Sequence, residues 1–200
     1  MSVTAAPKTK IDLENTVVLI VDDNRMSLDI LNSAFMGYGV RERVRVDNLD
    51  DALRTLKSRV VDLIILAGEM QEDAADALLA WIRREAPDPV CFTPVVVVLR
   101  HTARTSVFRM RDAGANYVVA KPISAGSLLS RVIWIARERR AFLKGESYTG
   151  PDRRFQNTGI PIGIDGRRAE DHCEELGGAV DPNLSQNEVD MMMKPMKVDL

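Results

Sequence analysis

Short apolar runs alternate with amphipathic segments from residue 15 to about residue 140 of the chain. Runs with the length of a β-strand are expected at residues 17–22, 43–47, 61–66, 94–99 and 116–120. Strand-length runs separated by helix-length segments are the sequence form of repeated βα units, and apolar strands of this kind are typical of a parallel sheet covered on both faces. The pattern therefore predicts an α/β fold.

Segments with helical spacing of apolar residues lie between these runs. The first extends from Met26 to Phe35, with Asn24 placed to cap its first turn, and the last follows Ser124 in the same way. The other three are marked by Ala52, Leu53 and Leu56, by Ala75, Leu78, Leu79, Trp81 and Ile82, and by Val107, Met110 and Ala113. Five strands and five helices in alternation predict a flavodoxin-like doubly wound sheet, with its ligand site at the carboxyl ends of the strands.

The composition changes after Arg140. Seven of the 12 glycines and four of the nine prolines lie in the last 60 residues, which is typical of a largely disordered tail. Residues 137–168 carry a net charge of +4 and residues 169–200 carry −6. We therefore expect a disordered N-terminus at 1–14, a globular domain at 15–140, an arginine-rich linker at 141–180 and an acidic tail with a short amphipathic helix at 181–200.

The net charge limits the expected classes of partner, and the cysteines indicate the expected compartment. With 27 basic and 29 acidic residues the net charge is −2, so the whole chain has no bulk attraction to DNA or to a membrane. Cys91 and Cys173 lack metal-ligand spacing and suit a reduced compartment. No segment approaches the ~18 apolar residues of a membrane span. The sequence predicts a cytoplasmic protein with neither DNA nor membrane as a partner.

Candidate pocket residues stand at the carboxyl ends of four expected strands. They are Asp22 and Asp23 after the first strand, Ala67 after the third, Leu99 at the end of the fourth and Lys121 after the fifth. This set resembles the phosphorylation pocket of CheY-like receiver domains. The resemblance implies that an acidic pair holds Mg²⁺, a lysine pairs with the phosphoryl oxygens, and an aspartate accepts the phosphoryl group from a phosphohistidine.

The resemblance also implies a degenerate pocket. Ala67 stands where receivers usually carry the acceptor aspartate, Leu99 replaces a threonine or serine, and Val118 replaces the switch aromatic residue. Three departures at coupled positions predict a receiver that is not phosphorylated. Asp22 and Asp23 keep a candidate metal site, at which we expect Mg²⁺ to be weak or absent, and a structural ion cluster with Lys121 is the favoured alternative.

Glu69 and the two histidines are the remaining candidates for chemistry or charge outside the pocket set. Glu69, two positions after Ala67, is expected to face solvent at the pocket mouth, and imitation of a phosphoaspartate is the alternative. His101 and His172 have no neighbouring nucleophile or ligand set and are expected to be ordinary loop residues.

Arginine pairs and aromatic residues follow the last expected helix, including the segment Gly150-Pro151-Asp152-Arg153-Arg154. This resembles the arginine-rich tail of CheY-like cyclic di-GMP effectors, the Cle group, and implies cyclic di-GMP as a ligand. Arginine can pair with guanine and phosphate, and an aromatic ring can stack on the base. The candidate nucleotide-binding residues are Arg139, Arg140, Tyr148, Arg153, Arg154, Phe155, Arg167 and Arg168. General anion or RNA contact, and a merely solvated tail, are the alternatives.

The segment Leu184-Ser185-Gln186-Asn187-Glu188-Val189-Asp190 resembles the N-terminal peptide of the flagellar switch protein FliM, which binds CheY. Ser185 and Glu188 have capping-box spacing, and apolar residues recur on one side of the expected helix. The candidate partner-binding residues are Leu184, Gln186, Glu188, Val189, Asp190 and Met192. This helix could bind the fourth-helix, fifth-strand and fifth-helix face of its own domain, recruit another CheY-like protein, or have no partner.

Together, these resemblances imply a non-enzymatic, phosphorylation-independent receiver-like adaptor of bacterial two-component and motility signalling. Its expected partner is a flagellar switch protein, a CheY-like protein or a histidine kinase, with cyclic di-GMP as a candidate ligand. One alternative is a phosphoaccepting response regulator of a histidine kinase phosphorelay. The other is a protein scaffold that docks a kinase or a receiver and binds no nucleotide.

Overall fold

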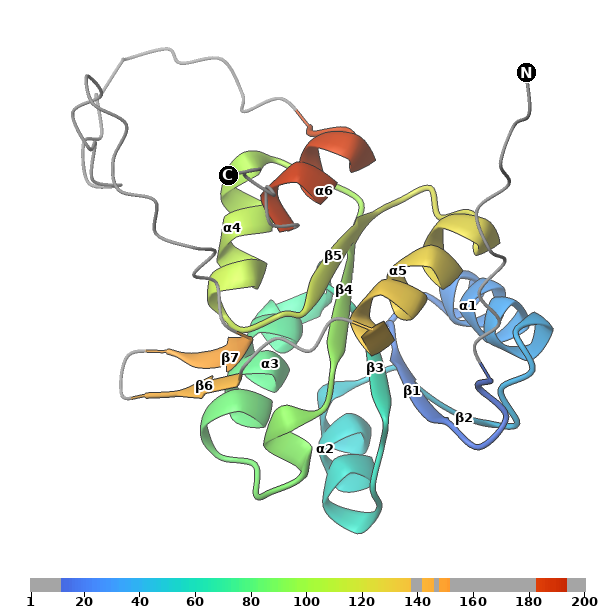
Figure 1. Cartoon of the computed structure of the whole chain (residues 1–200). Coiled ribbons are helices and arrows are strands. Elements are labelled where there is room, and N and C mark those ends of the chain that lie inside the picture. Colours follow the sequence, from blue (N-terminus) through green and yellow to red (C-terminus); the bar gives the residue numbers. More distant parts are fainter. Residues whose placement is uncertain (1–11, 138–141, 146–147, 152–182, 194–200) are drawn as a thin grey trace.

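In the computed structural model, five parallel strands form a sheet in the order β2-β1-β3-β4-β5 (Figure 1). The structure describes residues 12–137, 142–145, 148–151 and 183–193. The strands are β1 (Val17–Val21), β2 (Glu42–Val46), β3 (Leu63–Ala67), β4 (Val95–Leu99) and β5 (Tyr117–Ala120). The flavodoxin-like sheet predicted from the sequence is therefore confirmed.

Helices cover both faces of this sheet (Figure 1). In chain order they are α1 (Arg25–Gly37), α2 (Leu49–Ser58), α3 (Ala74–Arg84), α4 (Arg104–Asp112) and α5 (Ala125–Arg137), with short 3₁₀ turns at Gln71–Asp73 and Val90–Phe92. Helix α6 (Gln186–Met193) lies beside β5. No helix in the described parts of the chain has the length and apolar character needed to cross a membrane.

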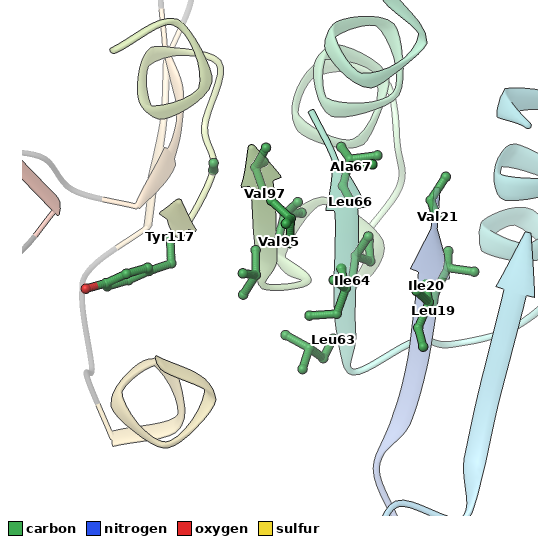
Figure 2. Packing of buried hydrophobic residues seen from close by; sticks show 14 of the residues in the cluster. Leu19, Ile20, Val21, Leu63, Ile64, Leu66, Ala67, Val95, Val97 and Tyr117 are labelled. Carbon is green, nitrogen blue, oxygen red and sulfur yellow. The ribbon is translucent and has the colours of Figure 1, made fainter. Parts of the chain in front are cut away.

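The core is built on β1, β3 and β4 (Figure 2). Every side chain of β3 and β4 is buried, because helices pack on both faces of these central strands. Each fully buried valine, leucine or isoleucine contributes about 1.5–3 kcal/mol relative to an exposed one. The buried strands therefore hold the loops at their carboxyl ends on a rigid base.

Side-chain caps fix where the helices begin. Asn24 accepts a hydrogen bond from the Ser27 N–H at 3.0 Å, and Ser124 accepts one from the Ser127 N–H at 3.1 Å. Both caps were predicted from the sequence and are confirmed. Because each cap satisfies an otherwise unpaired donor of the first turn, the two helices that flank the pocket begin at defined residues.

An antiparallel hairpin corrects the expectation of an unstructured linker after residue 140. Its strands are β6 (Phe142–Lys144) and β7 (Thr149–Pro151). The Phe142 ring packs edge-on against Phe92, with ring centroids 4.9 Å apart, and also covers the guanidinium of Arg83 at 5.2 Å. Strands of three residues are too short to give a periodic signal in the sequence. Because an isolated two-stranded hairpin is only marginally stable, these tertiary contacts stabilise it.

Arg83 is a buried cation beneath this hairpin, with 2% of its surface exposed. Its Nε donates to the Gly114 carbonyl at 2.9 Å, and one terminal nitrogen donates to the carbonyls of Cys91 and Thr93 at 2.7 and 3.0 Å. Its other terminal nitrogen donates to Asn116 Oδ1 at 2.9 Å. Desolvation lowers the pKa of Arg83 to about 10. The side chain thus ties α3 to the entries of β4 and β5 and to the hairpin.

Candidate functional site

The predicted pocket residues come together at the carboxyl edge of the sheet. Lys121 Nζ lies 3.0 Å from Asp22 Oδ2 and 2.9 Å from Ser27 Oγ. The other oxygen of Asp22 accepts the Asn24 N–H at 2.9 Å. Asp22 is buried, with 1% of its surface exposed, so the lysine offsets the desolvation of its carboxylate.

Asp23 is arranged differently from Asp22. It is exposed, and its carboxylate accepts the Gln71 N–H at 3.3 Å rather than the Lys121 ammonium. The expected ion cluster is therefore present for Asp22 but does not include Asp23. Across the residues that the structure describes, no group of three or more His, Cys, Asp or Glu side chains is placed to hold a metal ion.

Carbon atoms line the position where a phosphoryl acceptor would stand. Ala67 ends β3 with a buried methyl group, and the next residue, Gly68, packs against the buried side chain of Leu99. A Cβ added to Gly68 would lie under 3.0 Å from Leu99 Cδ2 and from Val97 Cγ1. A side chain at position 68 would therefore have to displace Leu99 or Val97, and both of these neighbours are apolar. The ends of β3 and β4 thus supply neither a nucleophile nor a hydroxyl group.

Glu69 is exposed, as expected from the sequence, and its carboxylate also contacts two residues of the loop between β4 and α4. Its Oε1 accepts the His101 N–H at 2.5 Å and lies 3.1 Å from His101 Nδ1, and its Oε2 lies 3.7 Å from Arg100 Nε. The loop between β4 and α4 folds over the end of β3 and brings these groups together. Consequently His101, expected to be an ordinary loop residue, is part of a contact across the pocket mouth.

Helix α6 is seated on β5 of its own domain, and its N-terminus follows the predicted capping box. The Glu188 carboxylate accepts hydrogen bonds from the Ser185 N–H at 2.8 Å and from the Ser185 hydroxyl at 2.7 Å. These bonds lower the pKa of Glu188. The segment before the helix is tied to the β4–α4 loop, because the Leu184 N–H donates to the Thr102 carbonyl at 2.8 Å and the Thr102 hydroxyl donates to the Leu184 carbonyl.

Gln186 binds the exposed backbone of the edge strand β5. Its Oε1 accepts the Ala120 N–H at 2.5 Å, and its Nε2 lies 3.4 Å from the Val118 carbonyl. An edge strand leaves backbone donors and acceptors unpaired, so one side-chain amide here takes the place of a neighbouring strand. The same amide nitrogen also donates to Asp190 Oδ1 at 2.7 Å, so Gln186 links the β5 backbone to the next turn of α6.

Asp190 and the apolar residues of α6 make further contacts between this helix and the domain. The Asp190 carboxylate pairs with Arg131 of α5 and accepts the Tyr117 hydroxyl at 2.8 Å. Figure 2 shows Tyr117 at the outer edge of the sheet, with its hydroxyl directed away from the strands. Val189 is fully buried, and Met193 is 2% exposed. Leu184 and Met192 pack on the same core at partial burial.

The residues of the domain that receive α6 were missed by the sequence analysis. These are Thr102, Tyr117 and Arg131, each from a different element. The one available signal was complementary charge, since Asp190 in an acidic tail needs a cation. Several arginines satisfied that condition equally, and only the fold selects Arg131.

Most of the predicted nucleotide-binding residues lie outside the described residues. They are Arg139, Arg140, Arg153, Arg154, Phe155, Arg167 and Arg168. Tyr148 is described, and its hydroxyl donates to the Pro151 carbonyl at 2.8 Å within the hairpin. Its ring lies against Gly150, where an added Cβ would meet the ring within 3.0 Å. Tyr148 therefore packs on its own hairpin.

Comparison with known sequences identifies one family. The sequence model of the response regulator receiver domain matches residues 18–133, more than half of the chain. The polar-differentiation response regulator DivK of Brucella anthropi is 24% identical over 115 residues, which cover 58% of this chain and 91% of DivK. The autoinducer 2 sensor kinase/phosphatase LuxQ of Vibrio parahaemolyticus is 29% identical over 115 residues, and the match covers 58% of this chain but only 13% of LuxQ.

Solved structures support the same fold. A putative response regulator from Chloroflexus aurantiacus aligns with a TM-score of 0.57 at 23% identity, covering 62% of this chain and 98% of that one. A two-component response regulator from Clostridium difficile aligns with a TM-score of 0.56 at 21% identity, covering 64% and 100%. Both alignments leave about a third of this chain without a counterpart.

Proposed function

Because the chain belongs to the response regulator receiver family, whose members work in two-component signalling, we propose that it is a receiver that acts without phosphoryl transfer. In this proposal it is a cytoplasmic, non-enzymatic adaptor. The observation that carries the proposal is the pocket itself, in which Ala67 offers no nucleophile and the apolar side chain of Leu99 packs against the adjacent Gly68. Signalling must then depend on which surface the domain exposes to a partner.

The surface that best fits this role is the α4–β5–α5 face, defined here by Thr102, Tyr117, the β5 edge and Arg131. It already binds one amphipathic helix, α6, through hydrogen bonds, a partly buried ion pair and buried apolar side chains. We propose that α6 competes with a partner helix of similar chemistry, supplied by a flagellar switch protein, another CheY-like protein or a histidine kinase. A tethered segment has an effective concentration of about millimolar, which makes it a strong competitor.

Competition can be tested with a labelled peptide of residues 183–193 and fluorescence anisotropy. The Val189→Asp chain should bind this peptide at least about tenfold more tightly than the wild type, because a buried carboxylate detaches the internal helix and frees the face. Met191 is 74% exposed on the same helix, so Met191→Asp should behave like the wild type. Equal binding to the wild-type and Val189→Asp chains would contradict the proposal.

Two alternative functions predict different experimental results. The Lys121–Asp22 pair, at 3.0 Å, retains part of a receiver pocket and favours a phosphoaccepting regulator served by Mg²⁺ and a histidine kinase. A scaffold that docks a kinase or a receiver would need the α4–β5–α5 face but no nucleotide. Acetyl phosphate labelling decides the first alternative, and nucleotide titration decides the second.

We further propose cyclic di-GMP as a ligand of the arginine-rich segment, on the basis of the sequence Gly150-Pro151-Asp152-Arg153-Arg154. Charge-assisted hydrogen bonds contribute about 1.5–3 kcal/mol each, so replacing Arg153 and Arg154 with alanine should weaken binding by at least about tenfold. Calorimetric titration at two salt concentrations measures this, and added salt should weaken the wild-type affinity. Negligible heats for both wild type and double variant would reject nucleotide binding and favour the scaffold.

A further inference from the structure

The loop between β4 and α4, residues 100–103, is held from two sides. On the pocket side, the carboxylate of Glu69 contacts Arg100 and His101. On the other side, Thr102 forms two hydrogen bonds with Leu184, the residue just before the capping box of α6. Adjacent residues of one short loop therefore contact the pocket mouth and the tail helix.

The backbone bond at His101 is the strongest of the contacts made by Glu69. The side chains of Arg100 and His101 are 56% and 75% exposed, and ion pairs of such exposed groups contribute little. The bond from the His101 N–H is different in kind, because a carboxylate accepts it at 2.5 Å and it fixes the main chain itself. Glu69 thereby restricts the peptide that leads into Thr102.

Thr102 transmits this restriction to α6. It is 2% exposed, so the groups that bind Leu184 cannot be replaced by bulk water while the loop keeps its position. The carbonyl and hydroxyl of Thr102 bind the N–H and carbonyl of Leu184, an arrangement that requires both backbones to be aligned. If the loop shifts, both hydrogen bonds between Thr102 and Leu184 are lost together.

We propose that Glu69 is a positioning residue for α6, and that its carboxylate holds loop 100–103 in the conformation to which α6 binds. This deepens the proposed function, on which it rests for the role of α6 as an occupant of the α4–β5–α5 face. A group that draws Glu69 away from His101 then loosens α6. Because such coupling is reciprocal, release of α6 also loosens the contact between Glu69 and His101.

Amide hydrogen exchange on the full chain tests the coupling. In Glu69→Ala, the amides of α6 should exchange at least about fivefold faster than in the wild type. Glu69→Gln should remain closer to the wild type, because an amide oxygen still accepts the His101 N–H. Glu85→Ala, which removes an exposed carboxylate at the far end of α3, is the matched control and should change nothing.

Two further measurements complete the test. Val189→Asp should accelerate exchange of the His101 amide by a similar factor, while the β4 amides of every variant remain protected. If the α6 amides are protected in the wild type and exchange at the same rates in Glu69→Ala, the proposed role of Glu69 is wrong. That result would leave the proposed competition at the α4–β5–α5 face unaffected. Unprotected α6 amides in the wild type would overturn both this role and the proposed competition at the α4–β5–α5 face.

Discussion

Arg83→Ala is expected to lower the free energy of unfolding by about 3 kcal/mol or more. The substitution removes the donor from the buried carbonyls of Gly114, Cys91 and Thr93. Each unpaired buried acceptor costs about 1–3 kcal/mol, and the lost side chain also leaves a cavity beneath Phe142. Urea denaturation followed by circular dichroism measures the change as a lower midpoint.

Two matched variants separate the causes of this loss. Arg84 is the exposed neighbour on α3, and Arg84→Ala should stay within about 0.5 kcal/mol of the wild type. Arg83→Met keeps most of the volume but no donor, so it should still be strongly destabilised if hydrogen bonding dominates. Wild-type stability of Arg83→Met would show that packing, rather than the hydrogen bonds to the carbonyls, accounts for the stability lost in Arg83→Ala.

Acetyl phosphate is expected to label a chain that carries both Ala67→Asp and Leu99→Thr. Ala67→Asp alone should be labelled much less, because Leu99 packs against the adjacent Gly68 and presents carbon to the space beside that residue. The second substitution opens that space and supplies a hydroxyl group, while Asp22 and Lys121 already stand at the same edge of the sheet. Intact-mass spectrometry after incubation with Mg²⁺ compares the two variants. Equal labelling of both would mean that Leu99 does not obstruct the pocket.

The sheet and its caps were predictable because they depend on local pattern. Each central strand is a continuous apolar run, and each observed strand begins and ends within two residues of its expected range. Asn24 and Ser124 were identified as caps because a short polar side chain just before an apolar helical period has few other roles. The alignment of strand ends then placed Asp22 and Lys121 together without any knowledge of side-chain geometry.

Contacts between distant segments could not be predicted in the same way. The hairpin of Phe142–Lys144 and Thr149–Pro151 exists through packing on Arg83 and Phe92, which are remote in the sequence. In the sequence, Arg83 looks like one of two consecutive arginines at a helix end. Its burial follows from the loops that enclose it, and these loops have no sequence period.

The environment of α6 shows the same limit. The capping box at Ser185 and the buried position of Val189 followed from helical spacing. The choice between docking on the same chain and recruiting another protein stayed open, because a short amphipathic helix fits many grooves. The contacts with Tyr117 and Arg131 resolve its place in this structure, and they depend on residues more than 50 positions away.

The most direct test of the central claim is the intact mass of the wild-type chain after incubation with acetyl phosphate and Mg²⁺. The Ala67→Asp/Leu99→Thr chain serves as the positive control under the same conditions. A receiver that acts without phosphoryl transfer should gain no phosphoryl mass, because Ala67 supplies no nucleophile at the end of β3. A stable, acid-labile adduct on Asp22, Asp23 or Glu69 of the wild type would contradict the account.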